Sequence, residues 1–469
     1  MKYMQDFLHA NHDDVVEAVK RFERMISKDK EVFFDVHQVE NIFDFYLEKS
    51  LLKQAEQILQ IGLRQHPQST SLLVKKAGFL ADSNQLDDAL GILLKVAPIE
   101  NTNPEVFITL GWVMLQKDEI HSAVRYFNRA VDLAFDDEED ILLEIAYNLN
   151  QSEVYIEAVK FLEILSNKYP NNTNALFEFA FALEKIGERQ RSINIYERVL
   201  ELDPFSENAW YNVGILYNKE DRFIEASQAY DFTIAINPYH TEAYFNKGNS
   251  LAHKGCFAEA LEAYIYHVSL SRDVVLTYQY IADCWEQLGN FDMAIRFYKL
   301  VTKELPESGD AWYGIGTALM EKEDFKNGLQ AIDQAISINP MNADYWFAHA
   351  RGLFELDQAD DATRSLENGL NIDPEELSGW IELLKLKMGL DKSFVLQEFL
   401  KELQEQYSDV AAIHYLSVII NYKYLNDNIS AFSELKKALN TDSSLLSYLL
   451  DEIPEIQKIP EFKSILPNT

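Results

Sequence analysis

Two carboxylates, Asp283 and Glu286, come closest to a catalytic arrangement in this sequence. A spacing of three residues places both on one face of a helix, where paired carboxylates could perform acid–base chemistry. The common catalytic and phosphate-binding patterns HExxH, CxxC, GxSxG and GxxxxGK do not occur in the sequence. We therefore predict that the chain is not an enzyme, with a site built across several helices as the alternative.

Other residue types that bind metals or cofactors are scattered along the chain. Cys256 and Cys284 are its only cysteines and cannot form a paired CxxC zinc module. Residues 314–316 begin like a dinucleotide-binding turn, but Leu319 stands where the third glycine belongs. The acidic run 136–140 lacks the register and the glycine of a calcium loop. The sequence therefore predicts no cofactor and no metal site.

Acidic residues dominate the charge of the chain. Its 42 Lys and Arg against 76 Asp and Glu give a formal net charge of −34. Such a charge repels phosphate backbones and anionic headgroups, so we expect neither nucleic acid nor a membrane surface as partner. The first residues lack the apolar run of a secretion signal, and no stretch approaches about 18 uninterrupted apolar residues. A cytoplasmic protein without membrane insertion is expected.

The composition and an internal period both indicate helices. Apolar residues make up 47% of the chain, whereas glycine and proline, which break helices, are few, at 17 and 12 of 469 residues. Six prolines recur at intervals of 34 or 68 residues: Pro170, Pro204, Pro238, Pro306, Pro340 and Pro374. Related segments follow this period, such as Asn208–Gly214, Glu242–Gly248 and Asp310–Gly316. Repeats of this length indicate stacked supersecondary units.

Small and large side chains alternate within each 34-residue unit. Over nine units the eighth residue is Ala or Gly, from Ala77 to Ala350, and the twentieth is Ala, Ser or Gly, from Ala89 to Ala362. The fourth and twenty-fourth residues are always large. Small residues allow two helices to approach closely, and large residues fill the adjacent grooves. The pattern therefore predicts helix pairs.

This pattern resembles the tetratricopeptide repeat, in which 34 residues form two antiparallel helices. The resemblance implies an all-α fold, an α-solenoid of stacked antiparallel helix hairpins that form a right-handed superhelix. A single hairpin cannot cover its own apolar stripe, so each unit must stack on its neighbours. Proline after the second helix ends one unit and begins the next.

The repeat pattern divides the chain into four segments. We expect degenerate N-terminal repeats or a cap over 1–66, nine clear repeats over 67–374, degenerate C-terminal repeats over 375–442 and a C-terminal cap or tail over 443–469. Within the third segment, Trp380 fits a first helix and Ala431 a second helix.

The resemblance also implies that positions 2, 5, 6, 9, 12 and 13 of each first helix line a concave groove. From Phe177 to Phe347, position 5 of successive units forms an aromatic ladder broken once, at Gln279, and amide side chains beside it could bond an extended peptide backbone. The predicted peptide-binding residues are Trp112, Tyr147, Phe177, Phe181, Tyr211, Asn212, Phe245, Asn246, Asn249, Gln279, Asp283, Tyr313, Phe347 and Arg351.

Charge indicates the kind of partner. The 54 groove positions of the nine units hold 13 acids and 4 bases, a denser negative charge than that of the whole chain. Such a surface steers a basic segment inward. We therefore predict a non-catalytic scaffold or adaptor that binds a basic segment of a partner protein, as a monomer or weak homo-oligomer. The alternatives are a regulatory or enzymatic protein with a site across the groove and a self-associating structural solenoid.

Overall fold

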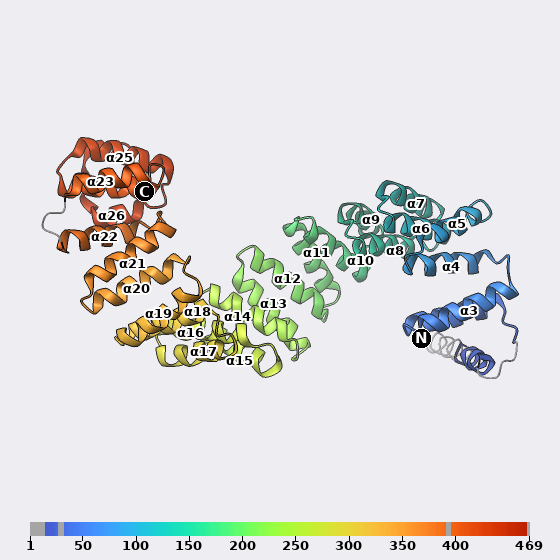
Figure 1. Cartoon of the computed structure of the whole chain (residues 1–469). Coiled ribbons are helices and arrows are strands. Elements are labelled where there is room, and N and C mark those ends of the chain that lie inside the picture. Colours follow the sequence, from blue (N-terminus) through green and yellow to red (C-terminus); the bar gives the residue numbers. More distant parts are fainter. Residues whose placement is uncertain (1–14, 27–31, 391–394, 467–469) are drawn as a thin grey trace. The chain divides into compact units, whose positions relative to one another are not determined.

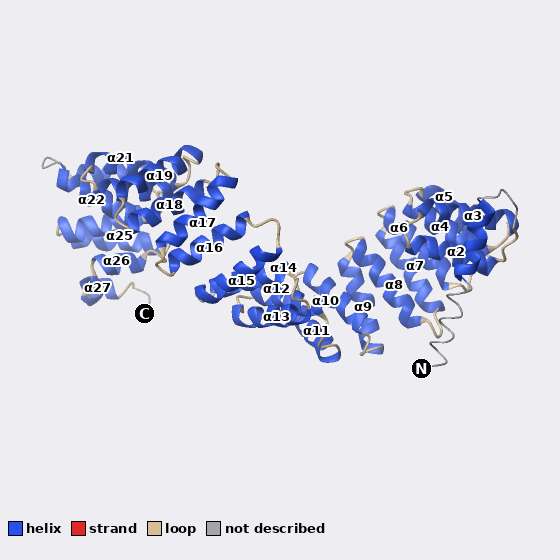
Figure 2. Ribbon diagram, turned by 90° about the horizontal axis from the view of Figure 1, so that it is seen from below, coloured by secondary structure: helices blue, strands red, loops and turns tan. Residues whose placement is uncertain are grey.

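The computed structural model describes residues 15–26, 32–390 and 395–466, and within these ranges the chain forms helices joined by short loops, with no strand (Figures 1 and 2). It divides into two compact units, Met1–Glu220 and Asp221–Thr469, which we describe separately. The prediction of an all-α solenoid of helix hairpins is confirmed. The boundary between the two units, after Glu220, lies inside a repeat and does not test the four predicted segments. The division into four segments therefore stays a prediction.

Unit 1 begins with helical residues 15–26. Its further helices are α2 (Val36–Glu48), α3 (Leu52–Gln65), α4 (Thr70–Asp82), α5 (Leu86–Val96), α6 (Pro104–Gln116), α7 (Ile120–Leu133), α8 (Glu138–Gln151), α9 (Tyr155–Lys168), α10 (Thr173–Lys185), α11 (Arg189–Leu202) and α12 (Glu207–Lys219). Connections of a few residues make consecutive helices antiparallel neighbours.

Unit 2 continues the same arrangement. Its helices are α13 (Phe223–Ile236), α14 (Thr241–His253), α15 (Phe257–Leu270), α16 (Val275–Gln287), α17 (Phe291–Glu304), α18 (Gly309–Glu321), α19 (Phe325–Ile338), α20 (Ala343–Glu355), α21 (Ala359–Ile372), α22 (Leu377–Leu390), α23 (Leu396–Gln406), α24 (Ala411–Ile419) with the π-helix η1 (Ile420–Tyr424), α25 (Asn428–Thr441), α26 (Leu446–Glu452), the 3₁₀-helix η2 (Pro454–Lys458) and α27 (Pro460–Lys463).

The small residues lie where the sequence predicts that two helices meet. All nine residues at position 8 and all nine at position 20 are buried. At Gly111 a Cβ atom would lie 2.3 Å from the ring of Phe127, the large residue at position 24 of the same hairpin, whose own side chain is fully buried. The ring therefore occupies the space that any side chain at position 111 would need.

Replacing Gly111 with alanine is expected to destabilise unit 1 by about 1–3 kcal/mol, because the buried ring must move to accept a methyl group. Gly78→Ala is a matched control, since no atom beyond its own stretch of helix lies within 4 Å of its Cβ position and alanine favours a helix. Urea denaturation of the two variants should show opposite shifts. Equal shifts would contradict close packing at position 8.

The turn inside each hairpin has a recurring backbone conformation. One residue per repeat, at position 15, has a positive φ between 55° and 84°. The nine residues are Asn84, Asp118, Glu153, Gly187, Asp221, Gly255, Gly289, Glu323 and Asp357. This left-handed residue ends the first helix and reverses the chain direction.

The junction between hairpins is fixed by a tryptophan and a proline in four places. The indole nitrogen donates to the carbonyl oxygen of the proline six residues earlier, at 2.8–3.0 Å. The pairs are Trp210 with Pro204, Trp312 with Pro306, Trp346 with Pro340 and Trp380 with Pro374. The proline thus both ends one unit and anchors the next first helix.

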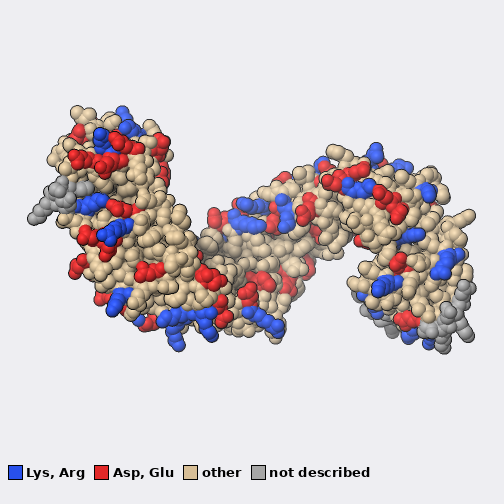
Figure 3. Space-filling view, in the orientation of Figure 1, with Lys and Arg blue, Asp and Glu red and all other residues tan. Residues whose placement is uncertain are grey.

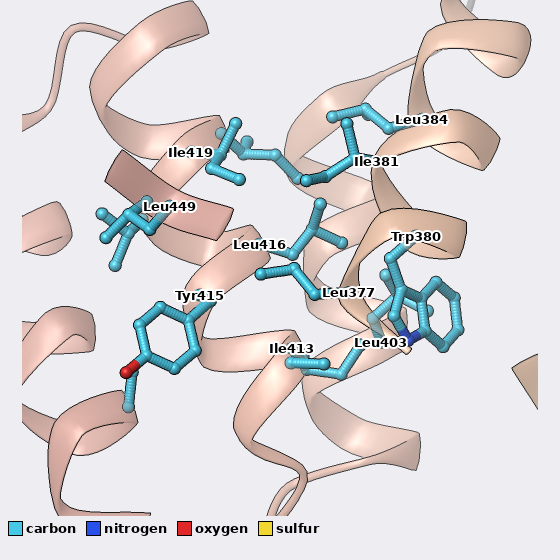
Figure 4. Packing of buried hydrophobic residues seen from close by; sticks show 14 of the residues in the cluster. Leu377, Trp380, Ile381, Leu384, Leu403, Ile413, Tyr415, Leu416, Ile419 and Leu449 are labelled. Atoms are coloured by element: carbon cyan, nitrogen blue, oxygen red, sulfur yellow. The ribbon is translucent and has the colours of Figure 1, made fainter. Parts of the chain in front are cut away.

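The C-terminal helices enclose the largest apolar cluster of the described residues (Figure 4). Trp380 and Ala431 lie on α22 and α25, the first and second helices that the sequence predicted. Two further helices, α23 and α24, lie between them in the chain. Beyond α25, Phe462 is 1% exposed and packs edge-on against Tyr422 and Phe432, with ring centroids 6.0 and 5.6 Å away. Residues 454–466 therefore cover the last hairpin.

Candidate functional site

The predicted peptide-binding residues lie on the first helices of the repeats. In unit 1, α4 contacts α6, α6 contacts α8 and α8 contacts α10, and in unit 2, α16 contacts α18 and α18 contacts α20. Among the described residues of the nine repeats, the second helices contact one another less extensively than these first helices do. Each stack is therefore tighter on the side of its first helices, and we call the surface formed by positions 2, 5, 6, 9, 12 and 13 the first-helix face.

Two hollows open on the first-helix face of unit 1. One, of about 330 Å³, is lined by Asp140, Leu143, Glu144, Tyr147, Asn174 and Glu178. The other, of about 270 Å³, is lined by Thr173, Asn174, Phe177, Glu178, Val199, Asp203, Ser206 and Asn208. Tyr147, 50% exposed, and Phe177 were predicted as groove residues, and each lines one hollow. Asn174 and Glu178 belong to both hollows, which are therefore adjacent along α10.

Carboxylates without a described cationic partner line the first hollow. No Lys or Arg of the described residues lies within 4 Å of the carboxylates of Asp140, Glu144 or Glu178, although the Asn150 amide donates to Glu178 at 2.8 Å. Water reaches the Glu144 side chain, but the wall of the hollow partly desolvates it, and with the negative charge of Glu105 this raises its pKa. A cation placed in the hollow would relieve this cost.

The remaining predicted residues of unit 1 are partly occupied by contacts of their own. The Trp112 indole donates to Asp82 at 3.2 Å, and Lys185 lies 5.0 Å above the Phe181 ring. Asn212 donates to the hydroxyl of Tyr196 at 3.1 Å. Tyr211 lies half-buried on α12. The structure thus brings Tyr147 and Phe177 to the two hollows, whereas Trp112 and Phe181 border acidic and basic side chains elsewhere on the face.

In unit 2, Phe245 is a packing residue at the edge of the first-helix face. Its ring lies 6.0 Å from Tyr264, 5.3 Å from His267 and 5.6 Å from Tyr280. Asn249 accepts a hydrogen bond from the Tyr264 hydroxyl at 2.7 Å. Asn246 and Gln279 are half-buried on α14 and α16. The Phe245 ring is therefore mainly packed against its neighbours and is less available to contact a ligand.

The carboxylate pair of the first-helix face shares one hydroxyl group. The Tyr298 hydroxyl lies 2.6 Å from Asp283 and 2.9 Å from Glu286, and Thr317 donates to Glu286 at 3.2 Å. A phenol has one proton, so it cannot fully satisfy two charged carboxylates. Burial, opposed by the bond from Tyr298 and reinforced by the charges of Glu286 and Asp310, raises the pKa of Asp283 to about 6.

Aromatic and charged residues follow along α18 and α20. Tyr313 stacks on Tyr345 with ring centroids 5.2 Å apart, and the Tyr345 hydroxyl donates to Asp310 at 2.5 Å. Arg351 pairs with Glu321 at 3.4 Å. Phe347 packs over the backbone of Gly369, where a Cβ would meet its ring at 2.6 Å. Asp283, Tyr313 and Arg351 therefore share the first-helix face, and Phe347 belongs partly to the core.

Sequence reasoning missed the polar role of the tyrosines at position 24. Tyr196, Tyr264 and Tyr298 are buried side chains whose hydroxyl groups reach Asn212, Asn249 and Asp283 on the first-helix face. The available signal was tyrosine in place of leucine or phenylalanine in consecutive repeats. The amides of Asn212 and Asn249 thus each have one group already bonded.

Residues with reactive side chains lie in packing positions. Burial, with the charge of Asp283, raises the pKa of the Cys284 thiol to about 12, so the thiol stays protonated at neutral pH. His267 is buried, bonds Thr277 at 2.9 Å and has a pKa lowered by that burial. Within the described ranges, no group of three or more His, Cys, Asp or Glu could hold a metal ion, and no helix is long and apolar enough to cross a membrane.

Helix hairpins that recur every 34 residues and pack on their neighbours define a helical repeat protein. The family model described as "Tetratricopeptide repeat" matches residues 173–206 and 309–342, which coincide with two of the units read from the sequence. The chain therefore contains tetratricopeptide repeats, as the resemblance predicted. Repeats of this kind are generally a non-catalytic fold and support a role as a protein-interaction scaffold.

Solved structures of similar proteins also consist of such repeats. MamA is 22% identical, with a TM-score of 0.36, over 38% of this chain and 96% of its own. YrrB, described as a protein with an unusual peptide-binding site, is 23% identical, with a TM-score of 0.36, over 38% of this chain and 92% of its own. A repeat protein from Parabacteroides merdae is 17% identical, with a TM-score of 0.38, over 53% and 98%. No curated protein matches the chain.

Proposed function

We propose that the chain is a non-catalytic scaffold whose first-helix face binds a basic, partly apolar segment of a partner protein. The observation that carries this proposal is the hollow on α8 and α10, where Asp140, Glu144 and Glu178 have no Lys or Arg partner among the described residues and lie beside the exposed ring of Tyr147. Lysine or arginine can pair with these carboxylates, and the tyrosine ring can hold an apolar or cationic side chain.

The distribution of charge favours a local binding site for the basic segment over a general attraction to the net negative charge of the chain. Basic and acidic side chains lie beside one another in several places on the face shown in Figure 3. Ion pairs such as Lys219 with Glu184 and Lys168 with Glu138 neutralise several acids of unit 1. The unpaired carboxylates of the hollow should therefore attract a basic segment more strongly than the acids that already form ion pairs.

A charge-matched peptide test examines the proposal. We expect a fluorescent peptide of about 12 residues, with lysine alternating with leucine and tyrosine, to bind more tightly than its glutamate counterpart. Raising salt from about 50 to 300 mM should weaken binding, since screening shortens the reach of the charges. The double variant Glu144→Gln with Glu178→Gln should bind about 5- to 30-fold more weakly, because each exposed pair contributes up to about 1 kcal/mol.

The control neutralises two exposed acids on second helices of the same unit, Asp132→Asn with Glu201→Gln, and should change affinity less than twofold. Tyr147→Ala, at an exposed position, tests the aromatic contribution without a core defect. Preference for the glutamate peptide, or equal losses in both double variants, would reject the proposal. The cytoplasmic location and the oligomeric state stay predictions.

A further inference from the structure

Unit 1 has a further hollow, larger than the two on the first-helix face, beside α3 and α4. It measures about 630 Å³ and is lined by Leu52, Lys53, Glu56, Leu59, Gln60, Leu63, Arg64, Lys76, Phe79, Leu80, Ser83 and Gln85. These residues come from α3, from the second half of α4 and from the turn before α5. Five of them are apolar, and Leu52 is 57% exposed. The hollow is thus an apolar groove open to water.

This groove is separate from the first-helix face. The first-helix positions of α4 are Ser71, Val74, Lys75, Gly78, Ala81 and Asp82. None of them lines the groove, whose residues in this part of the chain are Lys76, Phe79 and Leu80 on α4 and Ser83 just after it. At 100° per residue, the two sets occupy different sides of the helix. A ligand of the groove would therefore leave the first-helix face free.

The charge of the groove is opposite to that of the chain. It contains Lys53, Arg64 and Lys76 but only one acid, Glu56, whose side chain accepts a hydrogen bond from Gln60 at 3.0 Å. None of the three bases has a carboxylate within 4 Å among the described residues. On a chain of net charge −34, three unpaired bases around an apolar floor form a local exception.

The groove also has the length of a short helix. Its α3 residues run from Leu52 to Arg64 at helical spacing, a rise of about 18 Å at 1.5 Å per residue. Leu59, Leu63 and Phe79 form its floor, and the Phe79 ring is held edge-on by Phe43 at 6.1 Å. A helix of about three turns with one apolar face matches such a groove.

We propose that this groove binds a short amphipathic helix of a partner protein, with an apolar face and acidic flanks. Its apolar side chains would cover Leu52, Leu63 and Phe79, and its carboxylates would pair with Lys53, Arg64 and Lys76. The site goes beyond the first-helix face, because it lies on another side of the hairpins and selects the opposite charge. The chain then joins two partners of unlike charge.

Binding of two designed peptides to the full chain tests the groove. Both have about 14 residues with leucine at i, i+3, i+4 and i+7. One carries glutamate and the other lysine at the flanking positions. We expect the glutamate peptide to bind about tenfold more tightly, and the double variant Lys53→Glu with Lys76→Glu to lose that preference. The matched control, Lys303→Glu with Lys326→Glu, reverses two exposed lysines of unit 2 and should retain it.

A variant of an exposed apolar residue of the groove separates binding in the groove from general charge attraction. Leu52→Ser removes apolar surface at an exposed position and should weaken the glutamate peptide several-fold without unfolding the unit. A synthetic peptide of residues 1–14 that bound more tightly than the glutamate peptide would assign the groove to this chain itself and overturn the proposal. The proposal is also overturned if the lysine peptide binds equally well or if both lysine-pair variants behave alike.

Discussion

Replacing Phe462 with alanine is expected to lower the free energy of unfolding of the C-terminal hairpins by about 3–5 kcal/mol, the usual cost of removing a buried phenylalanine ring. Its side chain is 1% exposed and belongs to the cluster that α22, α24 and α25 share. A terminal hairpin of a solenoid has a neighbour on one side only, so its cap supplies the missing contacts. Loss of the ring should therefore uncover this cluster.

Hydrogen exchange can locate the effect of this substitution. We expect protection to fall in α24, α25 and α26 while helices near the N-terminus of unit 2 remain protected, since each repeat contacts mainly its neighbours. Ile429→Ala on α25 is the control, because that side chain is 85% exposed and its loss should cost less than about 0.5 kcal/mol. Comparable losses in the two variants would show that residues 454–466 do not cap the stack.

Asp283→Asn is expected to stabilise unit 2 at alkaline pH more than at acidic pH. The folded protein holds the Asp283 proton with a pKa of about 6, above the ordinary value of 3.8. The stability contributed by this proton is complete below pH 3.8 and is lost as the pH rises through about 6. Asparagine cannot ionise and does not lose this stability. The free energy of unfolding of the variant, relative to that of the wild type, should therefore increase by roughly 1–3 kcal/mol as the pH rises from about 4.5 to about 8, since one pKa unit corresponds to about 1.36 kcal/mol.

Urea denaturation at several pH values measures this difference. Glu304→Gln, an exposed acid on α17, is the control and should show no comparable pH dependence. A gain from Asp283→Asn that stays constant over the same pH range would show that Asp283 is not desolvated beside Glu286. The same ionisation would make the unit 2 part of the first-helix face more attractive to cations above about pH 6.

Much of the fold could be predicted because the repeats encode local packing. Ala77, Gly111 and their equivalents are small in every unit, and the period of 34 residues fixes where hairpins meet. The sequence did not predict the left-handed residue in each turn. Glu153 and Glu323 adopt a positive φ without being glycine or asparagine, so their identity carries no turn signal.

The site was less predictable than the fold. Position 5 of the repeat places Phe177 beside a hollow, but the rings of Phe245 and Phe347, at the same position of other repeats, lie partly in the core. The size of the neighbouring side chains decides how each ring lies. Tyr280 packs against the Phe245 ring, and Gly369, which has no side chain, leaves space for the Phe347 ring. The groove along α3 lies where the repeat pattern is irregular, so no periodic signal marked it.

The indole–proline bonds have a spectroscopic consequence. Four of the six tryptophans are held at junctions between consecutive hairpins, so the intrinsic emission of the chain reports mainly on those junctions. Separation of two adjacent hairpins would hydrate the indole and shift its emission to longer wavelength, even while both hairpins keep their helices. Fluorescence and circular dichroism would then diverge during partial unfolding, which allows unstacking to be observed apart from helix melting.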